Sequence, residues 1–220
     1  MRPLSLLEAR VLGVLIEKSL TVPDSYPLSL NALTLGCNQK TARDPVLAAS
    51  DAEVQGAVDA LKSLSLAFES SGSRVARYEH NLGRALGLPS QSVALLAALM
   101  LRGPQTASEL RTSSERLHRF ADVSAVEGFL DELSARADDK GGALVVKLPR
   151  APGAREQRWA HLLSGPVDAS AFAVAGGDSD AVVPLGELAT LKARVASAEA
   201  ELGRLAALVE RLYGELGIRR

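Results

Sequence analysis

The sequence contains very little cysteine and no long apolar segment, and both absences restrict what the protein can be. A single cysteine, Cys37, among 220 residues excludes an intrachain disulfide bond, so we expect a protein of the reducing cytoplasm. The longest uninterrupted apolar run, residues 93–101, is far too short to span a bilayer. No basic start followed by an apolar stretch and a cleavage site is present, and we therefore expect neither a secretory signal nor a membrane partner.

The sequence also lacks a strong excess of either charge. The formal net charge is −1, which argues against a chain whose whole surface attracts nucleic acid. Residues 1–80 carry eight basic and nine acidic side chains, residues 81–165 carry eleven and nine, and residues 166–220 carry six and eight. Any contact with phosphates must therefore come from local basic patches.

Motifs that carry catalysis or bind cofactors are missing as well. His80, His118 and His161 are scattered, and no group of His, Cys, Asp and Glu has the spacing of metal ligands. The sequence shows no Walker loop, dinucleotide fingerprint or Ser-His-Asp arrangement. We therefore expect no enzyme, no metal and no cofactor. His80 and His161 end equivalent strands of the repeat described next, which suits a structural role.

What the sequence does contain is an internal repeat. Residues 54–61, Val-Gln-Gly-Ala-Val-Asp-Ala-Leu, recur as residues 126–133, Val-Glu-Gly-Phe-Leu-Asp-Glu-Leu. In both copies the apolar residues fall at i, i+4 and i+7, the spacing of one helix face. Residues 11–18 resemble residues 95–102 in the same way. We therefore predict two copies of one small module, each with three helices followed by a β-hairpin.

Local signals place the elements within each copy. Capping boxes at residues 5–8 and 50–53 open the first and third helices of the first copy. The third helix of the second copy has two candidate starts, Asp122 from the register of the repeat and Ser124 from its own capping box. The predicted strands are residues 66–70, 74–80, 144–148 and 158–163, with residues 83–89 as a linker that can contain a short turn.

Two expectations concern how the helices pack. Glycine inside a helix costs about 1 kcal/mol relative to alanine. Its recurrence as Gly56 and Gly128 therefore suggests that another helix passes close at that point. The first helix should expose its charged side chains, which are Glu8, Arg10, Glu17 and Lys18.

The pattern changes after residue 165. Residues 166–184 are rich in Gly, Ala, Ser and Asp without periodicity and predict a flexible linker. In residues 185–218, apolar residues follow steps of three and four, which is typical of a coiled-coil helix and predicts a homodimer. The seam residues are Leu188, Leu191, Val195, Ala198, Leu202, Leu205, Val209, Leu212 and Leu216. The alternative is a tail helix that packs on its own domains.

Three helices and a hairpin in about 80 residues are typical of the winged-helix form of the helix-turn-helix. Longer stretches carry a more specific resemblance: residues 7–11 (Leu-Glu-Ala-Arg-Val), 26–29 (Tyr-Pro-Leu-Ser), 37–41 (Cys-Asn-Gln-Lys-Thr), 102–111 and 146–162. Over residues 6–165 the chain resembles the YceH-type family of uncharacterised bacterial proteins. This resemblance implies a mainly α chain with small β-hairpins, in which winged-helix domains at residues 1–82 and 83–165 stand in tandem before the coiled-coil helix. It implies no activity.

The third helices do not have the usual face of a DNA-reading helix. Their expected exposed positions are Asp51, Gln55, Asp59 and Lys62 in the first copy, and Glu127, Asp131, Glu132 and Arg136 in the second. Carboxylates repel phosphates, and among the bases only cytosine offers them a good partner. This composition argues against ordinary major-groove reading by either helix.

Positive charge gathers elsewhere. The candidate DNA-binding residues are Lys147, Arg150, Arg155 and Arg158 in the second hairpin, Arg111, Arg116 and Arg119 before the third helix of the second copy, and Lys40, Arg43, Arg74 and Arg77 in the first copy. These side chains could bind phosphates with little sequence specificity. The alternative is that an exposed hairpin uses Lys and Arg for solubility and for protection of its edge.

Three further residues or stretches have a structural and a functional interpretation. The polar stretch 38–40 with Arg43 could be a binding loop, but we favour Asn and Gln that stabilise the connection after the second helix. Cys37 is expected to be a small buried residue. Trp159 could stack on a base, but we expect it to anchor the hairpin.

Together these observations predict a cytoplasmic, dimeric DNA-binding protein that contacts phosphates through its basic wings and loops and acts in regulation. The alternative is a winged-helix scaffold that binds other proteins and no DNA. The acidic third helices favour this alternative, and the basic second hairpin favours DNA.

Overall fold

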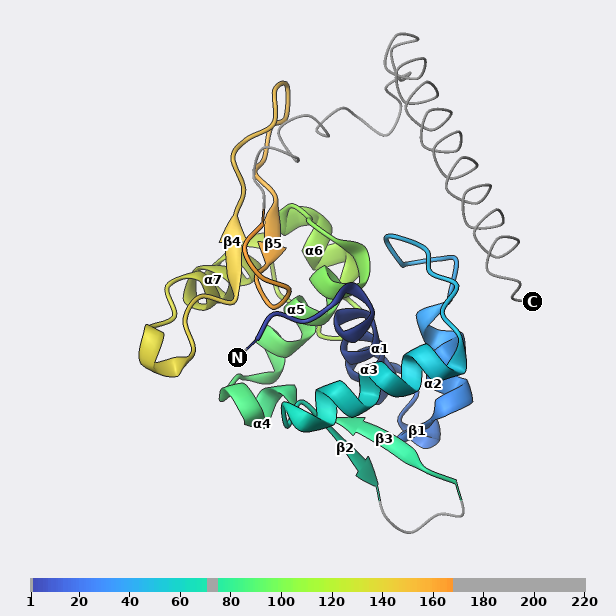
Figure 1. Cartoon of the computed structure of the whole chain (residues 1–220). Coiled ribbons are helices and arrows are strands. Elements are labelled where there is room, and N and C mark those ends of the chain that lie inside the picture. The colour runs from blue at the N-terminus through green and yellow to red at the C-terminus, as the bar shows by residue number, and fades with distance from the viewer. Residues whose placement is uncertain (1, 71–74, 168–220) are drawn as a thin grey trace, which may run out of the picture. The chain divides into compact units, whose positions relative to one another are not determined.

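The computed structural model describes residues 2–70 and 75–167, which belong to one compact unit formed by residues 1–176. Helices dominate this part of the chain, and its strands form two small antiparallel sheets (Figure 1). The prediction of a mainly helical chain with small hairpins is therefore confirmed. Arg74, the turn at residues 71–73, most of the predicted linker, and the coiled-coil segment with its seam from Leu188 to Leu216 lie outside the described residues.

The first half of the unit combines three helices with a three-stranded sheet. Its elements are α1 (Leu6–Thr21), a 3-10 turn (Pro23–Ser25), β1 (Leu28–Ser29), α2 (Leu30–Cys37), α3 (Asp51–Ser63), β2 (Ala67–Ser70) and β3 (Arg77–His80). β3 lies between β1 and β2 and is antiparallel to both. The buried Tyr78 of β3 donates its hydroxyl to Gln55 of α3 over 2.9 Å, which holds the sheet against this helix.

The second half follows the same order after a connecting helix, α4 (Leu82–Leu86). Its elements are α5 (Ser90–Arg102), α6 (Ala107–Ser113), α7 (Val123–Ser134), a 3-10 turn (Asp138–Lys140), β4 (Val145–Lys147) and β5 (Trp159–His161). β4 and β5 form a two-stranded antiparallel sheet in which Val146 faces Ala160. Each half thus has three helices followed by a hairpin, in the predicted order. The division into two domains at residue 82 stays a prediction.

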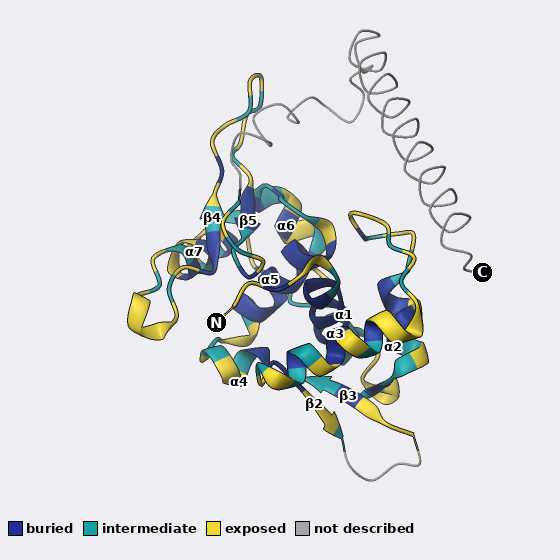
Figure 2. Ribbon diagram, viewed as in Figure 1, coloured by how far each residue is buried: buried dark blue, intermediate teal, exposed yellow. Residues whose placement is uncertain are grey.

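The core is densest where the first helices of the two halves pack together. α1 and α5 lie against each other, and the middle of both helices is buried (Figure 2). A Cβ atom on Gly13 would lie 3.0 Å from the side chain of Leu101, so this glycine allows the two helices to approach closely. The backbone N–H of Asp44 also donates to the carbonyl of Leu101 (2.8 Å), and that of Leu4 donates to the carbonyl of Leu163 (2.8 Å). The two halves therefore share one core.

The predicted caps open the helices. Capping boxes are present at residues 5–8 and 50–53, where the serine hydroxyl accepts from the glutamate N–H and the glutamate carboxylate accepts from the serine N–H. Thr106 and Glu109 form the same box at α6. Of the two candidate starts for α7, Asp122 is correct, since its carboxylate accepts from the N–H of Ala125 over 2.8 Å.

Two predictions about helices are wrong. The segment predicted as a linker contains α4, which ends at Gly87 in the left-handed conformation (φ 62°). No helix of the described residues passes close to Gly56 or Gly128, because a Cβ atom on either would meet nothing within 4 Å. The close approach is at Gly36 instead, where a Cβ atom would lie 2.6 Å from Cγ1 of Val14.

The charged side chains expected on the surface of α1 are not all exposed. Arg10 is completely buried and donates to the carbonyls of Cys37 (3.1 Å) and Pro45 (2.6 Å). Glu8 is buried as well and accepts two hydrogen bonds of 2.7 Å from Arg2. The reason is that α1 is packed by α2, α3, α5 and β3 together, which leaves this helix without a broad solvated face.

Candidate nucleic-acid interface

The hairpin of β4 and β5 is fixed at its base by Trp159. This side chain is 2% exposed, and its backbone N–H and C=O bond to the C=O and N–H of Gln105, just before α6 (2.7 and 3.1 Å). The ammonium of Lys147 lies 5.1 Å from the centre of the indole ring, within the range of a cation–π interaction. Trp159 is therefore an anchor of the hairpin, as predicted, and its ring cannot stack on a base.

Gln105 was missed by the sequence interpretation. Its buried side chain donates to the carbonyl of Ala98 (3.2 Å) and accepts from the hydroxyl of Ser113 (2.7 Å), so it joins α5, α6 and the hairpin. Its position in the Arg-Gly-Pro-Gln-Thr stretch at residues 102–106 gave no signal of this role, because glutamine is an ordinary surface residue. The hairpin is thus mounted on the helices through both backbone and side-chain bonds.

The basic residues of the hairpin differ between its base and its tip. Near the base, Arg158 donates to the carbonyl of Pro104 (2.8 Å) and to the carboxylate of Glu109 (3.0 Å). At the tip, Arg150 and Arg155 are exposed, and neither makes a hydrogen bond or ion pair with the described residues. The positive charge of the hairpin is therefore most available at its tip, on the loop that extends beyond β4 and β5 in Figure 1.

The connection between α6 and α7 carries the second group of cations. Arg111 donates to the carbonyl of Ala121 over 3.2 Å, which closes this connection on itself. Arg116 and Arg119 are exposed and have no bonded partner among the described residues. His118 packs edge-on against Phe120 with ring centres 4.7 Å apart, so it belongs to the packing of the connection.

The candidate DNA-binding residues of the first half have different surroundings. The prediction that Arg43 contacts DNA is wrong, because its guanidinium is buried and bonds to Glu17 (2.6 and 3.1 Å), to Gln39 (2.7 Å) and to the carbonyl of Gly36 (3.1 Å). It cannot reach a phosphate. Arg77 is exposed but donates to the carbonyl of Pro27 (2.7 Å), and Lys40 is exposed.

The exposed faces of the third helices are acidic, as the sequence predicts. Asp51 and Asp59 of α3 are exposed, and so are Glu127, Asp131 and Glu132 of α7. The other residues expected on these faces are half-buried: Gln55, Lys62 and Arg136. Arg136 donates to the carbonyls of Leu86 and Lys140, so it does not offset the carboxylates of α7 by direct pairing.

The polar stretch after α2 has a structural role, as we favoured. The amide of Asn38 donates to the carbonyl of Ala49 and accepts from its N–H, both over 2.8 Å, and so closes the connection to α3. Cys37 is buried, and burial raises the pKa of its thiol to about 12. A thiol with so high a pKa is no nucleophile at neutral pH.

Two histidines at the ends of the hairpins have lowered pKa values. Burial lowers the pKa of His161 to about 4 and lowers that of His80, which fits the structural role expected for both. Within the described residues, no group of three or more His, Cys, Asp and Glu could hold a metal ion. In the same residues, no helix is both long and apolar enough to cross a membrane.

These features define a mainly helical protein with small antiparallel sheets, whose second hairpin and α6–α7 connection expose arginines that have no acidic partner among the described residues. Residues 4–154 match the family described as "Protein of unknown function, DUF480", and the chain belongs to this family. It is 62% identical over 219 residues to a UPF0502 protein of Burkholderia multivorans, covering 99% of this chain and 91% of the relative. It is 60% identical over 219 residues to a UPF0502 protein of Leptothrix cholodnii, covering 99% and 97%. The resemblance to the YceH-type family is thereby confirmed.

Proposed function

We propose that this chain is a cytoplasmic protein of tandem winged helices that binds double-stranded DNA by contacting its phosphates. The observation that carries the proposal is that Arg116, Arg119, Arg150 and Arg155 are all exposed without a bonded partner among the described residues. In a winged helix, the hairpin and the segment before the third helix both lie beside the helix that faces the DNA. Free guanidinium groups at these places are suited to phosphate oxygens.

Each phosphate contact of this kind has little sequence specificity, and we propose that such binding serves regulation. The acidic faces of α3 and α7 disfavour base reading by these helices, so phosphates should supply most of the affinity. A homodimer through residues 185–218 would place two such surfaces on one duplex, and linkage multiplies weak contacts.

The test is a titration of random-sequence duplex at several salt concentrations, read by fluorescence anisotropy. The double variant Arg150→Gln/Arg155→Gln should bind more weakly. The slope of its log affinity against log salt concentration should be less steep by about two, since each phosphate contact contributes roughly 0.9 to this slope. The matched control is Arg84→Gln/Arg102→Gln, which removes the same charge from exposed positions of α4 and α5. Absence of binding at low salt, or equal salt dependence in both double variants, would contradict the proposal.

The second candidate is a scaffold that binds another protein and no DNA. The exposed carboxylates of α3 and α7 favour it, since they match a basic protein surface. Under this alternative the duplex titration shows no binding, and the charge reversal Asp131→Lys/Glu132→Lys removes the interaction with the protein partner.

A further inference from the structure

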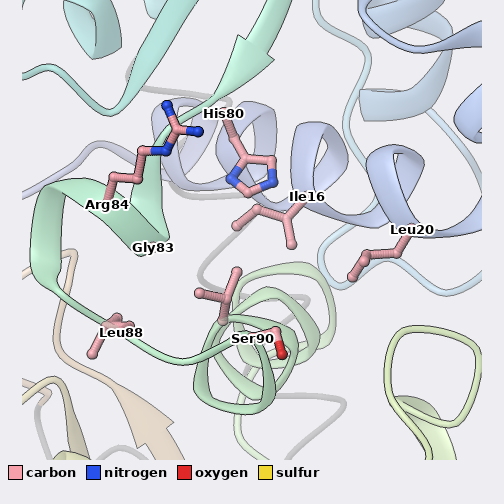
Figure 3. Close-up of a pocket in the computed structure, with 8 residues that line it drawn as sticks. Ile16, Leu20, His80, Gly83, Arg84, Leu88 and Ser90 are labelled. Carbon is pink, nitrogen blue, oxygen red and sulfur yellow. The ribbon is translucent and has the colours of Figure 1, made fainter.

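A cavity of about 340 Å³ lies between α1, α4 and the beginning of α5 (Figure 3). Small-molecule sites in proteins have volumes of roughly 300–1,000 Å³, so this cavity can hold a small ligand. None of the residues that line it belongs to the hairpin β4–β5 or to the α6–α7 connection. It is therefore separate from the candidate nucleic-acid interface.

The wall of the cavity is mainly aliphatic. Its apolar side chains are Ile16, Leu20, Leu88 and Val93. Leu20 is 43% exposed, so apolar surface at the cavity faces solvent. The ring of His80 also lines the cavity, and because burial lowers its pKa, the ring is neutral at neutral pH. An open apolar wall of this kind is favourable for an aliphatic chain, which leaves water on binding.

Arg84 is the one charged residue among the described residues that line this cavity. It is exposed and makes no hydrogen bond or ion pair with the described residues, and no carboxylate lines the cavity beside it. His80 ends β3, and Arg84 follows four residues later in α4. A guanidinium presents paired N–H groups that match the two oxygens of a carboxylate.

We propose that this cavity binds a medium-chain aliphatic carboxylate, with its chain among Ile16, Leu20, Leu88 and Val93 and its carboxylate at Arg84. The apolar wall favours the aliphatic part of the ligand, and the unpaired guanidinium favours its anionic end. Because α1 belongs to the first half and α5 to the second, the bound molecule contacts both halves. The proposal does not depend on DNA binding.

The first experiment is isothermal titration calorimetry of the full chain with octanoate, octanol and octylamine, each below its micelle-forming concentration. Octanoate should bind saturably. The neutral and cationic analogues should bind at least about tenfold more weakly, since they lack the bond to the guanidinium. Absence of saturable octanoate binding overturns the proposal. Equal affinity for octanol overturns the assignment of an anionic ligand.

The second experiment fills the cavity from Gly83. A Cβ atom there would lie 3.4 Å from the carbonyl oxygen of Leu88 and 3.5 Å from Cγ2 of Val93, which are ordinary contacts, so Gly83→Leu can place a side chain at the wall. It should abolish octanoate binding. Ala85→Leu, at an exposed position of the same helix outside the lining, is the matched control and should bind normally. Unchanged binding by Gly83→Leu would show that octanoate sits elsewhere.

A third variant keeps the proposal testable if Gly83→Leu does not fold. Arg84→Gln alters an exposed side chain and should weaken octanoate binding about tenfold while leaving octanol binding unchanged. Arg102→Gln, an exposed arginine of α5 outside the lining, should change neither affinity. If Arg84→Gln binds octanoate as tightly as Arg102→Gln does, Arg84 does not hold the carboxylate.

Discussion

Arginine side chains of this chain lie in very different surroundings. Arg150 is exposed without a bonded partner among the described residues, whereas the side chain of Arg43 is 0% exposed and bonds to Glu17. Burial alone would raise the pKa of Glu17, but the hydrogen bonds and charge of Arg43 hold it below its ordinary value. The carboxylate thus stays charged and compensates the buried guanidinium.

Replacing Arg43 by methionine should therefore destabilise the protein. We expect a loss of about 3 kcal/mol in the free energy of unfolding, because the variant leaves the Glu17 carboxylate with Lys18 alone and removes the side-chain donor of the Gly36 carbonyl. Lys40→Met, at an exposed position three residues earlier, should cost less than about 0.5 kcal/mol. Urea unfolding measures both. Similar small losses of the free energy of unfolding in the two variants would show that the buried ion pair does not stabilise the fold.

At the scale of the element, glycines inside helices differ in what surrounds them. Gly36 of α2 faces Val14 of α1 so closely that a Cβ atom would lie 2.6 Å from it. Gly56 of α3 and Gly128 of α7 have open space at the same position, although they are the glycines that the repeat conserves between its two copies. Helix propensity alone therefore decides the effect of a methyl group at the last two sites.

Alanine substitutions should separate the two kinds of glycine. Gly56→Ala should raise the free energy of unfolding by about 0.5–1 kcal/mol, because alanine favours the helix and meets no neighbour. Gly36→Ala should lower it by about 1–3 kcal/mol, because the methyl group forces α1 and α2 apart. Thermal unfolding compares the two variants, and Val14→Ala should offset part of the Gly36→Ala loss. Stabilisation by Gly36→Ala would contradict the close packing of these helices.

At the scale of the whole molecule, the two similar halves are parts of one compact unit. Their first helices share a core, and backbone hydrogen bonds from Asp44 to Leu101 and from Leu4 to Leu163 join them further. Each half alone would expose the apolar face that α1 and α5 now bury against each other. The two copies should therefore unfold together.

A further prediction at this scale concerns the oligomeric state. The apolar seam of residues 185–218 predicts a dimer, since a coiled-coil helix buries such a seam against a second copy. Sedimentation equilibrium should show a dimer for the full chain and a monomer for a chain that ends at Gly165. A dimer of unchanged affinity in the shortened chain would assign dimerisation to the helical unit instead.

The sequence by itself determined that each half has three helices followed by a hairpin, and it determined where α1, α3 and α6 begin. Capping at Ser5, Ser50 and Thr106 depends on hydrogen bonds within four residues, and helical periodicity depends on neighbours one turn away. Local patterns in the sequence specify such interactions. The acidic faces of α3 and α7 and the long stretches that carry the family resemblance can also be identified from the sequence.

Only the tertiary structure decided which charged and small residues are enclosed. Arg10 and Arg43 are buried because elements far apart in the chain supply carbonyls and a carboxylate around them, and Gly36 is crowded because α1 crosses α2 there. The cavity at Arg84 likewise exists because α1, α4 and α5 meet at one place. Burial depends on what packs around a residue, and no local pattern in the sequence specifies those neighbours.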